Sequence, residues 1–133
     1  MFKLLFSFFL FSIAPCVFAQ THAPVLTFQS LQNDIFQAKC FRCHSGDTAK
    51  GDVTLDNYEK LMAYPREAVI AGTPDESGIV ISVERDNTDE KRMPPPPKPG
   101  EQLPPHPKPW QTPLTAVEKA KLRQWIQEGA KKQ

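Results

Sequence analysis

Two cysteines and a histidine stand together in the pentapeptide Cys40-Phe41-Arg42-Cys43-His44. This is the C-x-x-C-H pattern that attaches c-type haem. Two thiols at this spacing, at the end of a helix, can each add to one vinyl group along the same edge of a porphyrin, and the histidine after the second thiol is then held beneath the iron. We therefore expect one haem c, attached covalently at Cys40 and Cys43, with His44 as the proximal iron ligand.

Three other interpretations of these residues are weaker. A redox dithiol normally lies at a strand-to-helix turn within a βαβ pattern, and the chain shows no such alternation. A structural zinc site needs four ligands, and no second pair of Cys or His follows at zinc-finger spacing. A plain disulfide between the two cysteines would leave His44 unexplained.

Residues 1–19 have the pattern of a cleavable secretory signal peptide. Lys3 supplies a positive start, the stretch from Leu4 to Phe18 is apolar, and Val17-Phe18-Ala19 offers a cleavage site after Ala19. A membrane anchor is the alternative, but this stretch is shorter than the roughly 20 residues that a spanning helix needs and contains Pro15. A lipid-bearing Cys16 is a further alternative, which Pro15 directly before it disfavours.

Cleavage after Ala19 would remove Cys16 and leave two cysteines, both in the haem motif. The reason for export would then be attachment of the haem, because no further cysteines remain to form disulfides. In bacteria this attachment takes place beyond the inner membrane, so we expect a periplasmic protein. Loss of Lys3 also leaves 15 Lys and Arg against 15 Asp and Glu, a balance that favours neither nucleic acid nor an anionic membrane as a partner, and no stable membrane insertion is expected.

The mature chain, residues 20–133, has the length of one small domain, and its periodicity predicts an all-α fold. Without internal repeats, the single motif implies a single haem, which would itself be a large apolar part of a modest core. A helix from about Thr27 to Lys39 would deliver Cys40 at its end. A last helix would begin with the Thr115–Glu118 capping box, end at Gly129, and press against the first helix through Trp125. Between them we expect a loop from Ser45 to Thr54, followed by three short helices. The first helix would begin after Asp56 or Asn57, the second would run from Pro65 to Ile70, and the third from Asp75 to Arg85.

A low-complexity stretch occupies residues 94–113. Nine of the 16 residues from Pro94 to Pro109 are proline, so this stretch cannot be helix interior and should be extended polyproline or irregular loop. It has the composition of a ligand for aromatic grooves. A surface loop insertion without a specific purpose is the more economical interpretation.

The second axial ligand decides what a haem held by His44 could do. The candidates in the mature chain are Met62, Met93, His22 and His106. Met93 is followed by prolines that stiffen its loop and restrict how its thioether is presented. Spacing alone does not select among the four.

The chain resembles the single-haem c-type cytochromes, and within them the bacterial group called planctomycete-type cytochrome c. The resemblance rests on segments that occur in order from about Phe28 onward: Asp34-Ile35-Phe36 with the C-x-x-C-H motif, Gly51 to Leu55, Gly72 to Ser77, Arg92-Met93-Pro94-Pro95, and Leu114-Thr115 leading to Trp125-Ile126 and Gly129-Ala130. The resemblance implies a small helical domain around one covalent haem, with Met93 as the distal ligand. The insertion from Pro96 to Pro109 departs from the family and introduces His106 as a rival ligand.

A His/Met site favours reversible one-electron transfer, because thioether ligation raises the reduction potential and six ligands leave no vacant position for substrate. We therefore expect an electron-transfer protein rather than an enzyme, working as a carrier or as a subunit of an oxidoreductase with redox partner proteins. Two alternatives remain at this stage. One is a haem enzyme or sensor with an open distal site, and the other is an interaction module that docks through the Pro-rich loop.

We predict that the exported protein begins at Gln20 because the signal peptide is removed after Ala19. N-terminal sequencing or intact mass of the protein purified from a bacterial host should show this start, with the glutamine free or cyclised. A lipid-modified Cys16 at the N-terminus would contradict the prediction and place the protein at a membrane surface.

Overall fold

The computed structural model describes residues 25–133. The signal peptide predicted for residues 1–19, Cys16 and His22 lie outside the described residues. Within them the secondary structure is helical, without strands, as the all-α prediction requires. No helix in this part of the chain has the length and apolar character needed to cross a membrane.

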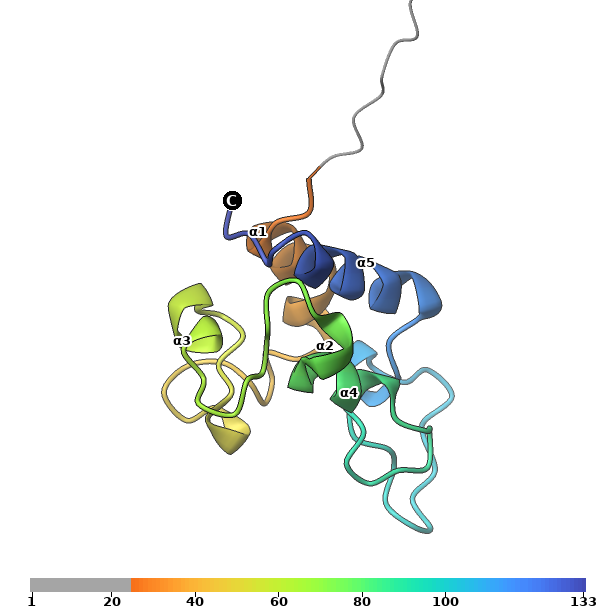
Figure 1. Ribbon diagram of the computed structural model, residues 1–133. Helices are drawn as coiled ribbons and strands as arrows, with labels where there is room; N and C mark the ends of the chain where they lie inside the picture. The colour runs from red at the N-terminus through yellow and green to blue at the C-terminus, as the bar shows by residue number, and fades with distance from the viewer. Residues whose placement is uncertain (1–24) are drawn as a thin grey trace, which may run out of the picture.

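Five α-helices and four other helical turns follow one another along residues 25–133 (Figure 1). The α-helices are α1 (Phe28–Leu31), α2 (Gln37–Lys39), α3 (Tyr58–Met62), α4 (Gly78–Glu84) and α5 (Ala116–Gln127). A π-helix, Gln32–Phe36, joins α1 to α2, and 3₁₀ turns occupy Lys50–Asp52, Pro74–Glu76 and Pro109–Gln111. The short helix expected after Asp56 or Asn57 is α3, which Asn57 caps.

The first helical run agrees in extent with the helix predicted from Thr27 to Lys39. Thr27 caps it, because its side chain accepts a hydrogen bond from the Ser30 N–H. The middle of the run is π-helical, since the Gln37 N–H donates to the carbonyl of Gln32, five residues back. This widened turn contains Ile35 and Phe36, both fully buried. The π-helix is thus the part of this element that periodicity did not predict.

Helix α5 packs across the first helical run, and Figure 1 shows the two side by side. Trp125 is fully buried, and its ring centroid lies 6.2 Å from that of Phe28. Its indole N–H donates to the carbonyl of Lys131 at 2.8 Å, and the same carbonyl accepts from the Phe28 N–H at 2.9 Å. The predicted role of Trp125, pressing the last helix against the first, is confirmed. The capping box between Thr115 and Glu118 is also present.

The helix predicted from Pro65 to Ile70 is wrong. This segment is a turn followed by extended chain, and Glu67 has a φ of 53°, a left-handed conformation that a helix interior does not admit. Its carbonyls pair outside the segment: Glu67 accepts from the Gly78 N–H at 3.1 Å and Ala68 from the Ile79 N–H at 3.0 Å. The segment therefore caps the start of α4 instead of forming its own helix.

The helix predicted from Asp75 to Arg85 is shorter in the structure. The first residues form the 3₁₀ turn Pro74–Glu76, and α4 proper covers Gly78–Glu84. Val80 and Val83 are buried in the core, whereas Ile79 is half-buried and faces a cavity. This helix therefore contributes both to the core and to the wall of a pocket.

The Pro-rich stretch forms an irregular loop. Residues 94–108 contain no helix or strand, and Pro109–Gln111 makes a single 3₁₀ turn before α5. Figure 1 shows this loop at the lower right, away from the C-terminus. The prediction that the Pro-rich stretch forms no helix is correct for residues 94–108.

Replacing Trp125 by Ala should lower the free energy of unfolding by about 3 to 5 kcal/mol, because it empties the contact between α5 and the first helix. Urea denaturation followed by circular dichroism would measure this. Val117→Ala on the same helix is the matched control, since Val117 is 67% exposed, and it should change the value by less than about 0.5 kcal/mol. Equal effects of the two changes would contradict the packing described here.

Candidate haem-binding site

The C-x-x-C-H motif turns tightly about one carbonyl. The Cys40 N–H continues the first helix by donating to the carbonyl of Phe36 at 2.8 Å. The Cys40 carbonyl then accepts from the N–H groups of both Cys43, at 3.1 Å, and His44, at 3.0 Å. Cys40 and Cys43 are half-buried free thiols. The helix end thus places two thiols and an imidazole within one turn.

Lys39 anchors this helix end to the start of α5. Its amine donates to the Thr112 hydroxyl at 3.1 Å and to the Pro113 carbonyl at 2.9 Å, and lies 3.5 Å from the Glu118 carboxylate. Only 9% of the Lys39 side chain is exposed. Since Lys39 precedes Cys40 directly, these contacts hold the first thiol in place.

Arg42 fastens the motif to the end of the Pro-rich loop. Its guanidinium carbon lies 4.8 Å from the centre of the Trp110 ring, a cation–π distance. This contact links the residues between the two cysteines to the 3₁₀ turn that precedes α5.

The loop after the motif folds back and orients the histidine. Lys50 donates its N–H to the Cys43 carbonyl and Leu55 donates its N–H to the His44 carbonyl, each at 2.7 Å. The loop thereby brings the Val53 carbonyl to 3.2 Å from Nδ1 of His44. A carbonyl oxygen can only accept, so this bond places the imidazole proton on Nδ1 and leaves the lone pair on Nε2. A histidine in this state is prepared to bind a metal through Nε2.

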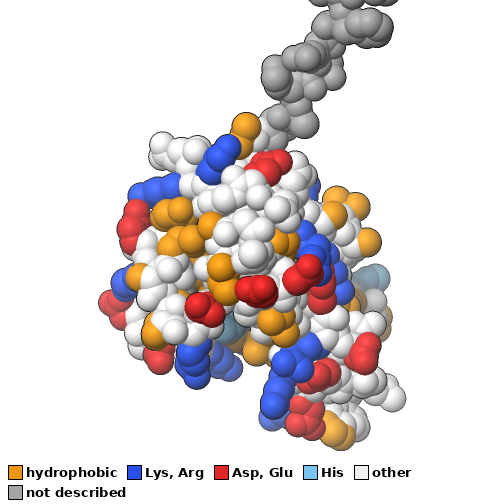
Figure 2. All heavy atoms as spheres, in the orientation of Figure 1, with side chains coloured by type: hydrophobic (Ala, Val, Ile, Leu, Met, Phe, Trp, Pro, Cys, Tyr) orange, Lys and Arg blue, Asp and Glu red, His pale blue; other side chains and the backbone are white. Residues whose placement is uncertain are grey.

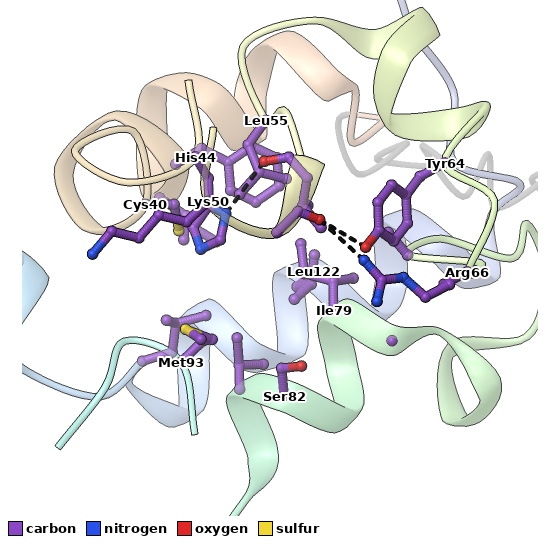
Figure 3. Close-up of a pocket in the computed structure, with 18 residues that line it drawn as sticks. Cys40, His44, Lys50, Leu55, Tyr64, Arg66, Ile79, Ser82, Met93 and Leu122 are labelled. Atoms are coloured by element: carbon purple, nitrogen blue, oxygen red, sulfur yellow. Dashed lines mark hydrogen bonds between the residues drawn. The ribbon is translucent and has the colours of Figure 1, made fainter. Parts of the chain in front are cut away.

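A mostly apolar cavity of about 450 Å³ opens beside the motif. Cys40, His44 and Met93 all line it. Figure 3 shows His44 above the cavity and Met93 below it, with Leu122 and Ile79 behind. Separate stretches of the chain therefore meet there: the first helix with its motif, the loop after the motif, the segment from Tyr64 to Ala68, α4, the loop that carries Met93, and α5 with the residues just before it.

The remaining candidate ligands lie elsewhere. Met62 and His106 do not line this cavity, and His106 is exposed on the Pro-rich loop. Met93 has 37% of its surface exposed, and its N–H donates to the Ser82 carbonyl at 2.9 Å. That bond holds the methionine loop against α4. Of the candidates in the described residues, only Met93 is brought to the same cavity as His44.

The geometry disfavours the redox and zinc interpretations of the motif. Burial raises the pKa of the Cys40 thiol to about 12, whereas a redox dithiol reacts as a thiolate and has a lowered pKa. Among the described residues, no group of three or more His, Cys, Asp and Glu side chains is arranged to hold a metal ion. A tetrahedral site built by the protein alone is therefore absent from this part of the chain.

The residues present fit a haem. The volume is in the range of small-molecule and cofactor sites, and the walls are apolar with a few convergent polar groups. An imidazole nitrogen with a free lone pair and a thioether sulfur, the two axial donors of many c-type haems, both reach this space. The buried neutral thiol of Cys40 lies at its edge.

A helical domain with a C-x-x-C-H motif beside an apolar cavity is the architecture of a cytochrome c domain. Residues 40–97 match the family described as planctomycete cytochrome C. This match confirms the predicted resemblance over these residues, which are similar to the planctomycete-type cytochrome c family. Neither the curated proteins nor the solved structures searched gave a significant match. Cytochrome c domains bind haem c covalently, so the family supports a haem and iron protein.

Sequence reasoning missed several groups at this site. The Val53 carbonyl and the Ser82 carbonyl are backbone atoms, which carry no sequence signal. Tyr64 and Arg66 also line the cavity, but Arg66 falls in the predicted helix from Pro65 to Ile70 and Tyr64 directly precedes it. Their place there depends on the turn that replaces it.

Proposed function

We propose that this protein is a monohaem c-type cytochrome that transfers single electrons in the periplasm, as a carrier or as the electron-transfer subunit of an oxidoreductase. The observation that carries the proposal is the meeting of Cys40, His44 and Met93 around one apolar cavity. The family match over residues 40–97 supports the same class of protein.

Each thiol of the motif has a defined task in this proposal. Cys40 and Cys43 would hold the haem through two thioethers, formed by addition of each S–H across a vinyl group. Lys39 and the turn about the Cys40 carbonyl hold the thiols ready for this.

The axial ligands set the redox chemistry. Haem supplies a one-electron iron couple when it is bound. His44 provides Nε2, with the Val53 carbonyl fixing the ring and increasing the basicity of the nitrogen. Met93 provides a thioether, which favours the ferrous state. The mostly apolar walls would limit the access of water to the haem, and a site with both ligands held by the protein would need little reorganisation on electron transfer.

The exposure of Met93 favours one second candidate, a haem sensor or enzyme with a weakly held distal ligand. Its side chain is held by a single loop and 37% of its surface is exposed. In that case carbon monoxide would bind the ferrous protein readily, whereas a firm His/Met site would resist it.

The proposed partners are redox proteins rather than nucleic acid or membranes. Figure 2 shows Lys and Arg side chains interspersed with Asp and Glu over the drawn face, without one dominating sign. A mixed surface suits transient docking between two proteins better than binding to a polyanion.

Protein produced in a host with the haem-attachment machinery should carry one haem that survives acid-acetone extraction, as shown by intact mass and a pyridine haemochrome spectrum. Cys40→Ala or Cys43→Ala should leave at most one thioether and lower the yield of haem protein. Ser45→Ala, next to the motif, should load normally. If the mass of the wild-type protein shows no added haem, the proposed function is wrong.

Met93→Ala should abolish the weak sulfur-to-iron charge-transfer band of the ferric protein, lower the reduction potential, and allow carbon monoxide to bind the ferrous form. The visible spectrum and a potentiometric titration measure these effects. Met62→Ala is the matched control and should change none of them, because Met62 does not line the cavity. If His106→Ala alters the band while Met93→Ala leaves it intact, the ligand assignment is wrong.

A further inference from the structure

The cavity has two chemically different ends. Cys40 lies at one end, whereas Tyr64 and Arg66 line the other, across the cavity from it (Figure 3). The wall between them is built largely from aliphatic side chains such as Ile79 and Leu122. A tyrosine and an arginine are unusual in a lining of this kind, and both have polar groups to offer a ligand.

The guanidinium of Arg66 has N–H groups that could bind a ligand. Among residues 25–133, the only hydrogen bond of its side chain is a long one, 3.4 Å from Nη2 to the carbonyl of Gly51. No carboxylate within the described residues lies at ion-pair distance from it. A guanidinium has five N–H donors in a planar fork that suits a carboxylate, so most of the fork is available.

Tyr64 holds the guanidinium at the rim. Its hydroxyl donates to the Gly51 carbonyl at 2.8 Å, which fixes the ring, and the guanidinium carbon of Arg66 lies 5.3 Å from the ring centre. Figure 3 shows both side chains converging on the same carbonyl oxygen at the edge of the cavity. Tyr64 is therefore a positioning residue for Arg66.

Haem carries two propionates, whose carboxylates could bind the guanidinium of Arg66. Its two vinyl groups and its two propionates lie on opposite sides of the macrocycle, so anchoring the vinyl side at Cys40 and Cys43 directs the propionates away from the cysteines. We propose that Arg66, positioned by Tyr64, binds a haem propionate at this end of the cavity. The inference rests on the proposed function, since it requires the haem.

Two other cations are less suitable. Lys50 lines the cavity, but Figure 3 shows its amine extending away from it, on the side of Cys40. Arg92 is only 2% exposed and does not line the cavity, so its guanidinium is covered by protein. Arg66 is the cation placed to meet a carboxylate opposite the thioethers.

The test uses the haem-loaded mature protein and resonance Raman spectroscopy, because the propionate bending vibration responds to hydrogen bonds on the carboxylate. Arg66→Gln should shift this band toward the position of a solvated propionate and lower the reduction potential, since the propionate loses its counter-charge. Arg66→Lys, which keeps the charge but loses the planar fork, should give an intermediate shift. Tyr64→Leu should shift the band in the same direction by a smaller amount.

Lys50→Gln is the matched control, because it removes one positive charge from the rim of the same cavity and should leave the propionate band in place. The proposal is overturned if Arg66→Gln has the wild-type band, or if Lys50→Gln shifts the band equally. Should Arg66→Gln fail to accumulate haem protein, a wild-type band in both Arg66→Lys and Tyr64→Leu overturns it instead. Failure of the proposed function itself is visible earlier, as a wild-type protein without covalent haem.

Discussion

The orientation of His44 is the constraint on which the rest of the site depends. An imidazole can ligate iron through Nε2 only when its proton is on Nδ1, and the Val53 carbonyl holds it there. That carbonyl is in place because the loop after the motif returns to pair with the backbone of Cys43 and His44. The His44 imidazole, the loop and the thiols are therefore a single folded unit, and a change in one alters the others.

The cavity lies where the small core is incomplete. A chain of this size buries limited apolar surface by itself, and its aliphatic and aromatic residues form one cluster between the first helical run, α4 and α5. Several members of that cluster, among them Ile35, Phe36 and Leu122, also line the cavity. A bound haem would extend this core and join its elements, so cofactor binding and folding stability are coupled in the proposed protein.

The Pro-rich loop is attached at both ends without disturbing this arrangement. The Met93 N–H ties its start to α4, and the contact of Trp110 with Arg42 ties its end to the haem motif. The family match ends at residue 97, just inside the proline-rich stretch. These two contacts fasten the loop to α4 and to the motif, and the first of them holds Met93 beside the cavity.

The sequence by itself determined the motif, the all-α class, the first and last helices and the role of Trp125, because thiol spacing, helical periodicity and capping boxes are local signals. Only the tertiary structure decided the rest. The π-helical turn, the turn at Glu67 in place of a helix, and the approach of Val53, Tyr64 and Arg66 to the cavity depend on hydrogen bonds between distant backbone groups. Backbone carbonyls are the same in every residue, so the pattern of side chains in the sequence does not predict which carbonyls pair with distant backbone groups.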